Sequence, residues 1–251
     1  MRRLVVGNWK MNGTRASLGD LRRLASAAAA AEVDVIVAPP FTLLADAARE
    51  VPGVPVAGQD CHRDPAGAHT GSVSAAMIRE AGAAAVILGH SERRRNGESD
   101  ADVAGKVAAA ASEGLVPIVC VGETWGERER GTHLASLRAQ VAGSLPEHVG
   151  GGVVAYEPVW AIGSGRTPSA EEIAEALDAV ASVLETRADR AGWRLLYGGS
   201  VSEANAGELV AVEGLHGFLV GGASLSAEGL LPIIAASGRG AGTRIAAGEA
   251  A

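Results

Sequence analysis

Cysteine is scarce in this sequence, which has only Cys61 and Cys120 among its 251 residues. A disulfide scaffold needs several cysteines, and a cysteine-based zinc site needs pairs of them at short, fixed spacings. Two isolated cysteines meet neither requirement. We therefore expect neither a disulfide framework nor a metal site.

Long apolar runs are also missing, and none approaches the roughly 18 residues that a membrane-spanning helix requires. The opening segment, MRRLVVGNWK, has only three apolar residues between its basic pair and Gly7, which is too few for the core of a signal peptide. We therefore expect a cytoplasmic protein.

Positive charge is in deficit, with a net charge of −7 and a pI near 5.4. This balance argues against nucleic acid or an anionic membrane as the main partner. It permits a small anionic substrate, because a local pocket can be positive on an acidic protein.

Short apolar runs are abundant, and they alternate with longer alanine-rich stretches of helical spacing. Several runs are rich in Val, Ile and Leu without strict alternation, as expected of parallel strands covered on both faces. The predicted strands span 3–8, 33–38, 54–58, 84–88, 115–121, 152–156, 193–198 and 215–220. The predicted helices between them include 16–31, 101–113, 129–143 and 169–188.

Eight strand–helix units in a chain of this length predict an α/β fold, the (β/α)8 TIM barrel, with eight parallel strands inside a ring of outer helices. A doubly wound sheet fits the same alternation but usually has fewer strands. No linker divides the chain, so we expect a single barrel domain over 1–237. Residues 238–251 are poor in core-forming side chains, and we expect this tail to fray.

Four polar side chains follow strand ends, where a parallel barrel places its active site. Asn8 and Lys10 end the first strand two residues apart, so both can face the same way in an extended chain. His90 follows the fourth strand and Glu157 the sixth. A barrel would bring all four to one mouth.

Each of these residues also has a simpler interpretation. Lys10 could be a solvated loop residue, and Glu157 a surface carboxylate before a proline. His90 could be a packed residue before a helix cap at Ser91. Their shared position at strand ends favours a common site over separate coincidences.

Glycine pairs follow the seventh and eighth strands, at Gly198–Gly199 and Gly221–Gly222. With 34 glycines in the chain, such pairs also arise by chance, so the pairs alone do not indicate a phosphate site. Their position is more informative, because barrels commonly bind phosphate through backbone N–H groups after these two strands.

Six segments resemble the triosephosphate isomerase family, in the family's order: GNWKMN (7–12), LGHSERR (88–94), IVCVGET (118–124), AYEPVWAIGSGR (155–166), YGGSV (197–201) and LVGGASL (219–225). The resemblance covers nearly the whole chain. It implies a catalytic base at Glu157, an electrophile at His90, and anion-side donors at Lys10 and Asn8. It further implies that Glu92 lies near Lys10 and that a substrate phosphate is held by the amides of Gly163, Ser164, Gly165, Ser200, Gly221 and Gly222.

The chemistry of such an enzyme moves one proton between adjacent carbons of a sugar phosphate through an enediolate. It needs a base on the C–H bond and a donor for the developing oxyanion, and a glutamate base with a neutral histidine is a well-known feature of this family. Segment 158–166 resembles the family's lid, so we expect Glu157 to be exposed to water until the lid closes. No metal ion or organic cofactor is needed.

The resemblance implies interconversion of D-glyceraldehyde 3-phosphate and dihydroxyacetone phosphate, with a small phosphorylated sugar as the partner. One alternative is a related isomerase of a four-carbon ketose phosphate, erythrulose phosphate. Another is a phosphate-binding barrel without catalytic activity.

The chain departs from the family pattern on the surface through which members dimerise. Thr70 is retained, but His69 stands where an apolar aromatic residue is usual. Ser72 replaces a glutamate that usually pairs with the arginine matching Arg93. Segment 91–100 is one residue shorter and lacks the aromatic residue that receives the partner's loop. We expect a homodimer with an atypical interface.

The lid's second hinge also differs, because RTP (166–168) replaces the family's KTA. Pro168 is expected to restrict rotation there, since its ring locks one backbone angle. This predicts slower or altered lid closure.

Overall fold

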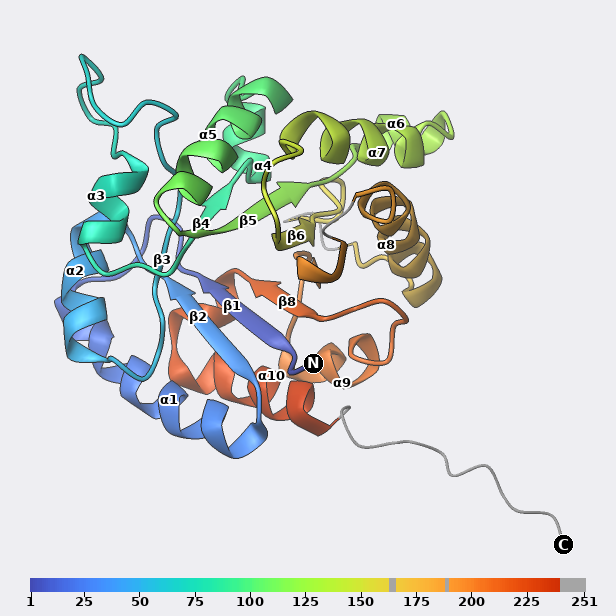
Figure 1. Ribbon diagram of the computed structural model, residues 1–251. Coiled ribbons are helices and arrows are strands. Elements are labelled where there is room, and N and C mark those ends of the chain that lie inside the picture. The colour runs from blue at the N-terminus through green and yellow to red at the C-terminus, as the bar shows by residue number, and fades with distance from the viewer. Residues whose placement is uncertain (163–165, 188–189, 240–251) are drawn as a thin grey trace, which may run out of the picture.

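Eight parallel strands form a ring at the centre of the molecule, and helices surround it (Figure 1). The computed structural model describes residues 1–162, 166–187 and 190–239. The strands are Leu4–Asn8 (β1), Asp34–Ala38 (β2), Ala57–Gly58 (β3), Ala85–Leu88 (β4), Val116–Val121 (β5), Gly152–Tyr156 (β6), Trp193–Tyr197 (β7) and Gly217–Val220 (β8). They follow the order β2-β1-β8-β7-β6-β5-β4-β3, and a parallel bridge between Val37 and Val56 joins the two edges. The predicted (β/α)8 barrel is confirmed.

The helices form the outer layer. They are Gly19–Ala31 (α1), Phe41–Glu50 (α2), Ala75–Glu80 (α3), Ser91–Arg95 (α4), Asp100–Ser112 (α5), Trp125–Glu129 (α6), His133–Ser144 (α7), Ala170–Leu184 (α8), Glu203–Leu209 (α9) and Ala227–Arg239 (α10). Short 3-10 turns span Arg15–Leu18 (η1), Arg190–Gly192 (η2) and Gly222–Leu225 (η3). Among the described residues, no helix is both long and apolar enough to cross a bilayer.

Helix α8 shows why these stretches are helical. Ser169 caps its first turn, because its hydroxyl accepts a hydrogen bond from the backbone N–H of Glu172 at 3.2 Å and the Glu172 carboxylate accepts one from the Ser169 N–H at 2.8 Å. Apolar residues at steps of three and four then face the barrel: Ile173, Leu177, Val180 and Leu184 are all buried.

Two apolar cores hold the barrel together. The inner core fills the ring with both small and large side chains, so the barrel is packed and is not a pore. Its buried members are Leu4, Val6, Ala38, Ala57, Ala85, Ile87, Ile118, Cys120, Val153, Ala155, Leu196 and Leu219. The larger outer core lies between the strands and the helices.

Several element boundaries differ from the predicted ones. The predicted helix 129–143 begins only at His133, because Gly131 adopts a left-handed φ of 69° that separates α6 from α7. The predicted strand 54–58 shortens to β3, since Pro55 has no N–H to donate. Helix α10 includes the first two residues of the expected tail, and residues 240–251 lie outside the described residues.

Candidate active site

A cavity of about 280 Å³ opens where the strands β1, β4, β6, β7 and β8 end. All four predicted catalytic residues line it, together with three of the predicted phosphate-binding residues. The lining residues are Asn8, Lys10, His90, Glu157, Ile162, Gly198, Gly199, Ser200, Val201, Leu219, Gly221 and Gly222. Gly163, Ser164 and Gly165 lie outside the described residues. Barrel closure thus brings together side chains that are far apart in the sequence.

Glu157 follows β6 and is only 2% exposed. Its Oε2 accepts a hydrogen bond from the Ser91 N–H at 2.8 Å, and its Oε1 lies 3.0 Å from His90 Nε2. We expected this carboxylate to be exposed to water before lid closure. The structure shows it buried, because these two partners replace water around its oxygens. Burial and the nearby Glu157 charge raise the pKa of the Cys120 thiol beneath it.

His90 follows β4 through Gly89, whose φ of 66° turns the chain. The ring itself caps α4, one residue before the cap that the simpler interpretation of His90 placed at Ser91: Nδ1 of His90 accepts a hydrogen bond from the Glu92 N–H at 3.2 Å. An accepting Nδ1 carries no proton, so a neutral ring has its proton on Nε2, the nitrogen that faces Glu157.

Lys10 lies in a turn after β1, with a left-handed φ of 53°. We expected an extended chain here, but the turn is made by the Lys10 N–H donating to Asn8 Oδ1 at 3.0 Å. Gln59 Nε2 supports the turn by donating to the Lys10 carbonyl at 2.8 Å. A non-glycine residue in this region is unusual and is typical of functional sites.

Glu92 orients the Lys10 ammonium, which donates to Glu92 Oε1 at 2.6 Å. Burial acts to raise the pKa of Glu92, but the hydrogen bond and charge of Lys10 outweigh it and hold that pKa below its ordinary value. Glu92 is therefore ionised at neutral pH, and its placement near Lys10 is as the sequence predicts.

The end of the cavity where the sequence predicts phosphate binding is formed by backbone after β7 and β8. Gly221 precedes η3, and Gly222 is the first residue of that turn, so N–H groups there are free of helical partners. Gly198 is required for space, since a Cβ there would lie 2.9 Å from Glu157 Cγ. Ser200 follows in the next loop and lines the same cavity.

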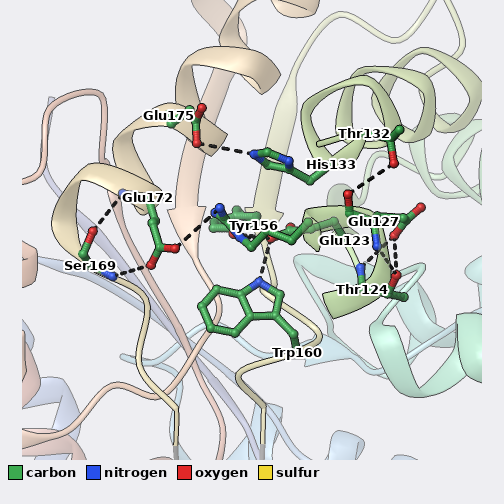
Figure 2. Close-up of polar contacts among 11 residues, drawn as sticks. Glu123, Thr124, Glu127, Thr132, His133, Tyr156, Trp160, Ser169, Glu172 and Glu175 are labelled. Carbon is green, nitrogen blue, oxygen red and sulfur yellow. Dashed lines mark hydrogen bonds and ion pairs between the residues drawn. The ribbon is translucent and has the colours of Figure 1, made fainter. Parts of the chain in front are cut away.

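The start of the predicted lid is tied to the loop after β5 by Glu123, which is fully buried. Glu123 Oε1 accepts hydrogen bonds from the Trp160 indole at 2.7 Å and from the Tyr156 hydroxyl at 3.0 Å (Figure 2). Burial, aided by the Glu123 charge, raises the pKa of Tyr156, so the hydroxyl remains a donor.

The second lid hinge contacts α6. The Arg166 guanidinium lies 4.3 Å from the centre of the Trp125 ring, and Trp125 in turn packs 5.6 Å from Trp160. Pro168 is buried directly before Ser169, the cap of α8. Both ends of segment 158–168 are therefore attached to neighbouring helices or loops.

Sequence reasoning missed Ser91, Gln59 and Glu123 as parts of this site. Ser91 acts through its backbone N–H, which leaves no signature in the side chain. Gln59 follows β3 as Lys10 follows β1, so its position at a strand end was the available signal.

The predicted interface residues Thr70, His69 and Ser72 lie in the loop between β3 and α3, which projects from the barrel (Figure 1). Arg93 is on α4 and binds Asp60 Oδ2 of its own chain at 2.8 Å. Ser72 stands where the sequence comparison led us to expect a glutamate partner for Arg93. Asp60 provides a carboxylate for Arg93 instead.

Comparison with known proteins shows which family the chain resembles. The family model described as triosephosphate isomerase matches residues 3–237. Triosephosphate isomerase of Ruegeria sp. (strain TM1040) is 52% identical over 240 residues, covering 94% of this chain and 98% of the relative. The Xanthobacter flavus enzyme is 49% identical over 244 residues, covering 94% and 98%. A crystal structure of triosephosphate isomerase from Bartonella henselae has a TM-score of 0.87 and 42% identity, covering 94% of this chain and 99% of that one. The chain belongs to the triosephosphate isomerase family.

Proposed function

We infer that this protein is an aldose–ketose isomerase that interconverts D-glyceraldehyde 3-phosphate and dihydroxyacetone phosphate. Full-length relatives named for the triose reaction support it over the four-carbon alternative. One observation carries the proposal at the site: Glu157 Oε1 and His90 Nε2 lie 3.0 Å apart in a cavity that Lys10 also lines. Glu157 can thus act as a base, and His90 as a proton donor, on neighbouring atoms of one substrate.

Glu157 is the proposed base, which takes a proton from one carbon and returns it to the next. His90 donates from Nε2 to the oxygen on which negative charge develops. These two groups now face each other, so the reacting carbon and its oxygen enter between them. Glu157 must exchange its bond to the Ser91 N–H for contact with the substrate.

Lys10 and Asn8 are the proposed donors on the anionic side of the substrate. The ammonium is fixed by Glu92, so its charge is oriented before the substrate binds, and little reorganisation is needed during the reaction. No step of this mechanism uses a metal ion or an organic cofactor.

The substrate phosphate is proposed to bind the amides of Gly221 and Gly222, with Ser200 on the adjacent loop. The lid amides of Gly163, Ser164 and Gly165 would complete the shell. The Gly221 and Gly222 amides and Lys10 share one cavity, which supports a single anion site.

Glu157→Gln tests the proposed base. Removing the carboxylate should lower kcat by about 10²- to 10⁴-fold, the usual contribution of a positioned general base. The measurement is conversion of dihydroxyacetone phosphate in a coupled assay, with binding of inorganic phosphate as a check that the site is still formed.

Glu203→Gln, an exposed change on α9, is the matched control and should keep wild-type activity. Activity of Glu157→Gln within a few-fold of wild type would refute the assignment of the base. The same assay with erythrulose phosphate tests the substrate, and a preference for it would replace the triose reaction.

We also propose a homodimer that forms through the loop between β3 and α3, with an interface unlike that of typical members. The projecting loop that carries Thr70 supports this arrangement (Figure 1). The Arg93–Asp60 pair supports an altered interface, because Arg93 is occupied within its own chain.

Two further proposals concern the whole chain. A single barrel domain over 1–237 is supported by the family match over nearly the same range. A cytoplasmic location is supported by the two cysteines, which are both buried and free of disulfides.

A further inference from the structure

A second cluster of polar side chains lies away from the cavity, in the loop between β3 and α3. One nitrogen each of His62 and His69 and one carboxylate oxygen of Asp64 lie within 4.8 Å of one another. Asp64 Oδ2 is 3.2 Å from His69 Nε2 and 3.8 Å from His62 Nδ1. The two rings stack, with their centres 3.8 Å apart and their planes at 26°.

The loop backbone holds this cluster together. Its base is closed where the His62 N–H donates to the Val73 carbonyl at 2.8 Å. At its tip, the His69 N–H donates to the Gly67 carbonyl at 3.0 Å, which turns the chain back over His62. The Asp64 N–H donates to His62 Nδ1 at 3.0 Å. The cluster is therefore formed before any ligand arrives.

Gly67 leaves room for the His69 ring because it has no side chain. The φ of Gly67 is 148°, and a Cβ there would lie 3.0 Å from His69 Nε2. A larger residue would push the ring away from Asp64. The loop thus has glycine where the imidazole needs space.

We propose that His62, Asp64 and His69 bind a divalent transition metal ion of the Zn²⁺ class. Two imidazoles and one carboxylate are typical zinc donors, whereas Mg²⁺ and Ca²⁺ prefer an all-oxygen shell. Tetrahedral zinc with bonds of roughly 2.0–2.2 Å places neighbouring ligand atoms about 3.4 Å apart. The separations of Asp64 Oδ2 from His69 Nε2 and from His62 Nδ1, 3.2 and 3.8 Å, lie on either side of that value, and all three ligand atoms lie within 4.8 Å of one another.

Metal binding requires the cluster to rearrange, because the two stacked rings must separate. His62 Nδ1 exchanges its hydrogen bond from the Asp64 N–H for the metal, and a water molecule completes the shell. All three side chains are partly exposed, so the His69 ring can rotate out of its stack on His62 until both imidazoles point a nitrogen at one ion. The proposal rests on one chain and does not depend on the proposed dimer.

The ion would link two points of the loop that are seven positions apart, directly before Thr70. Binding to the folded state also raises thermal stability by mass action. The metal would thereby stiffen the segment that presents Thr70 to its surroundings.

Zinc titration of the full-length, chelator-treated protein tests the site. Isothermal calorimetry with ZnCl₂ should show one equivalent per chain with a dissociation constant in the micromolar range. His69→Ala and Asp64→Asn should each weaken binding at least about tenfold, since even residues that only support a ligand contribute that much. Mg²⁺ should not compete.

His148→Ala is the matched control, because His148 is an exposed histidine outside the cluster. Co²⁺ gives a second readout in the unaltered protein: a tetrahedral absorption band should appear with it and be displaced by Zn²⁺. Absence of zinc binding, or equal affinity in His69→Ala and His148→Ala, would overturn the proposal.

Discussion

At Glu157 a carboxylate is almost fully buried between two partners. A backbone N–H from Ser91 and a ring nitrogen from His90 replace the water it would otherwise bind. This arrangement is possible only because Gly198 has no side chain to collide with the carboxylate. The reactivity of one residue therefore depends on the backbone of three different strand ends.

Glu92→Gln tests the electrostatic support of Lys10. The pKa of Glu92 is lower in the folded chain than in the unfolded chain, so the pair stabilises the fold fully above the unfolded value of about 4.3. That stabilisation is lost as the pH falls through the lower folded pKa. The pair is partly exposed, so the difference should be at most about 1 kcal/mol.

Urea unfolding of wild type and Glu92→Gln over a pH series measures this effect. The wild-type midpoint should be higher near neutral pH, and the two midpoints should converge as the pH falls below about 4. Glu203→Gln should show no such convergence. A gap that widens on acidification would contradict the prediction.

Among the elements, the lid segment has the most informative contacts. Its first part is bonded to Glu123 through Trp160, and its last part rests on Trp125 of α6 through Arg166. These contacts hold the two described ends of the segment against the loop after β5 and against α6. The restriction expected from Pro168 stays a prediction.

Trp125→Ala should release the lid hinge. A cation–π contact at an exposed site contributes about 0.5–1 kcal/mol, so its loss should shift the lid equilibrium about two- to fivefold. We expect the affinity for a phosphorylated enediolate mimic to change by that factor, measured by calorimetry. Trp125→Phe keeps an aromatic face and should lie between alanine and wild type. Unchanged binding in Trp125→Ala would rule out this role.

The two ends of the barrel differ in the polar groups that they carry. The proposed active site lies at the carboxyl ends of the strands. The opposite mouth contains an ion pair between Asp34 of β2 and Arg194 of β7, with 2.7 Å between its atoms. The loop between β3 and α3, which carries Thr70, projects from the barrel (Figure 1).

Thr70→Glu tests the proposed dimer. A charge placed in an interface without a partner should weaken association at least about tenfold, with a parallel loss of activity at low protein concentration. Sedimentation equilibrium measures the dissociation constant, and Thr186→Glu, at an exposed position after α8, is the control. A wild-type protein that remains monomeric at micromolar concentration would refute the dimer.

The sequence alone determined the barrel, because apolar periodicity and strand count follow from local burial and do not require knowledge of contacts. It also placed Asn8, Lys10, His90 and Glu157 after the ends of strands. All strands of a parallel barrel end at the same face, so these four residues were expected to lie together. Tertiary structure alone decided which atoms meet. The bond between Ser91 and Glu157 spans 66 positions, and the stack of His62 on His69 depends on a glycine turn. Such contacts depend on ring closure and on backbone angles that residue identity does not specify.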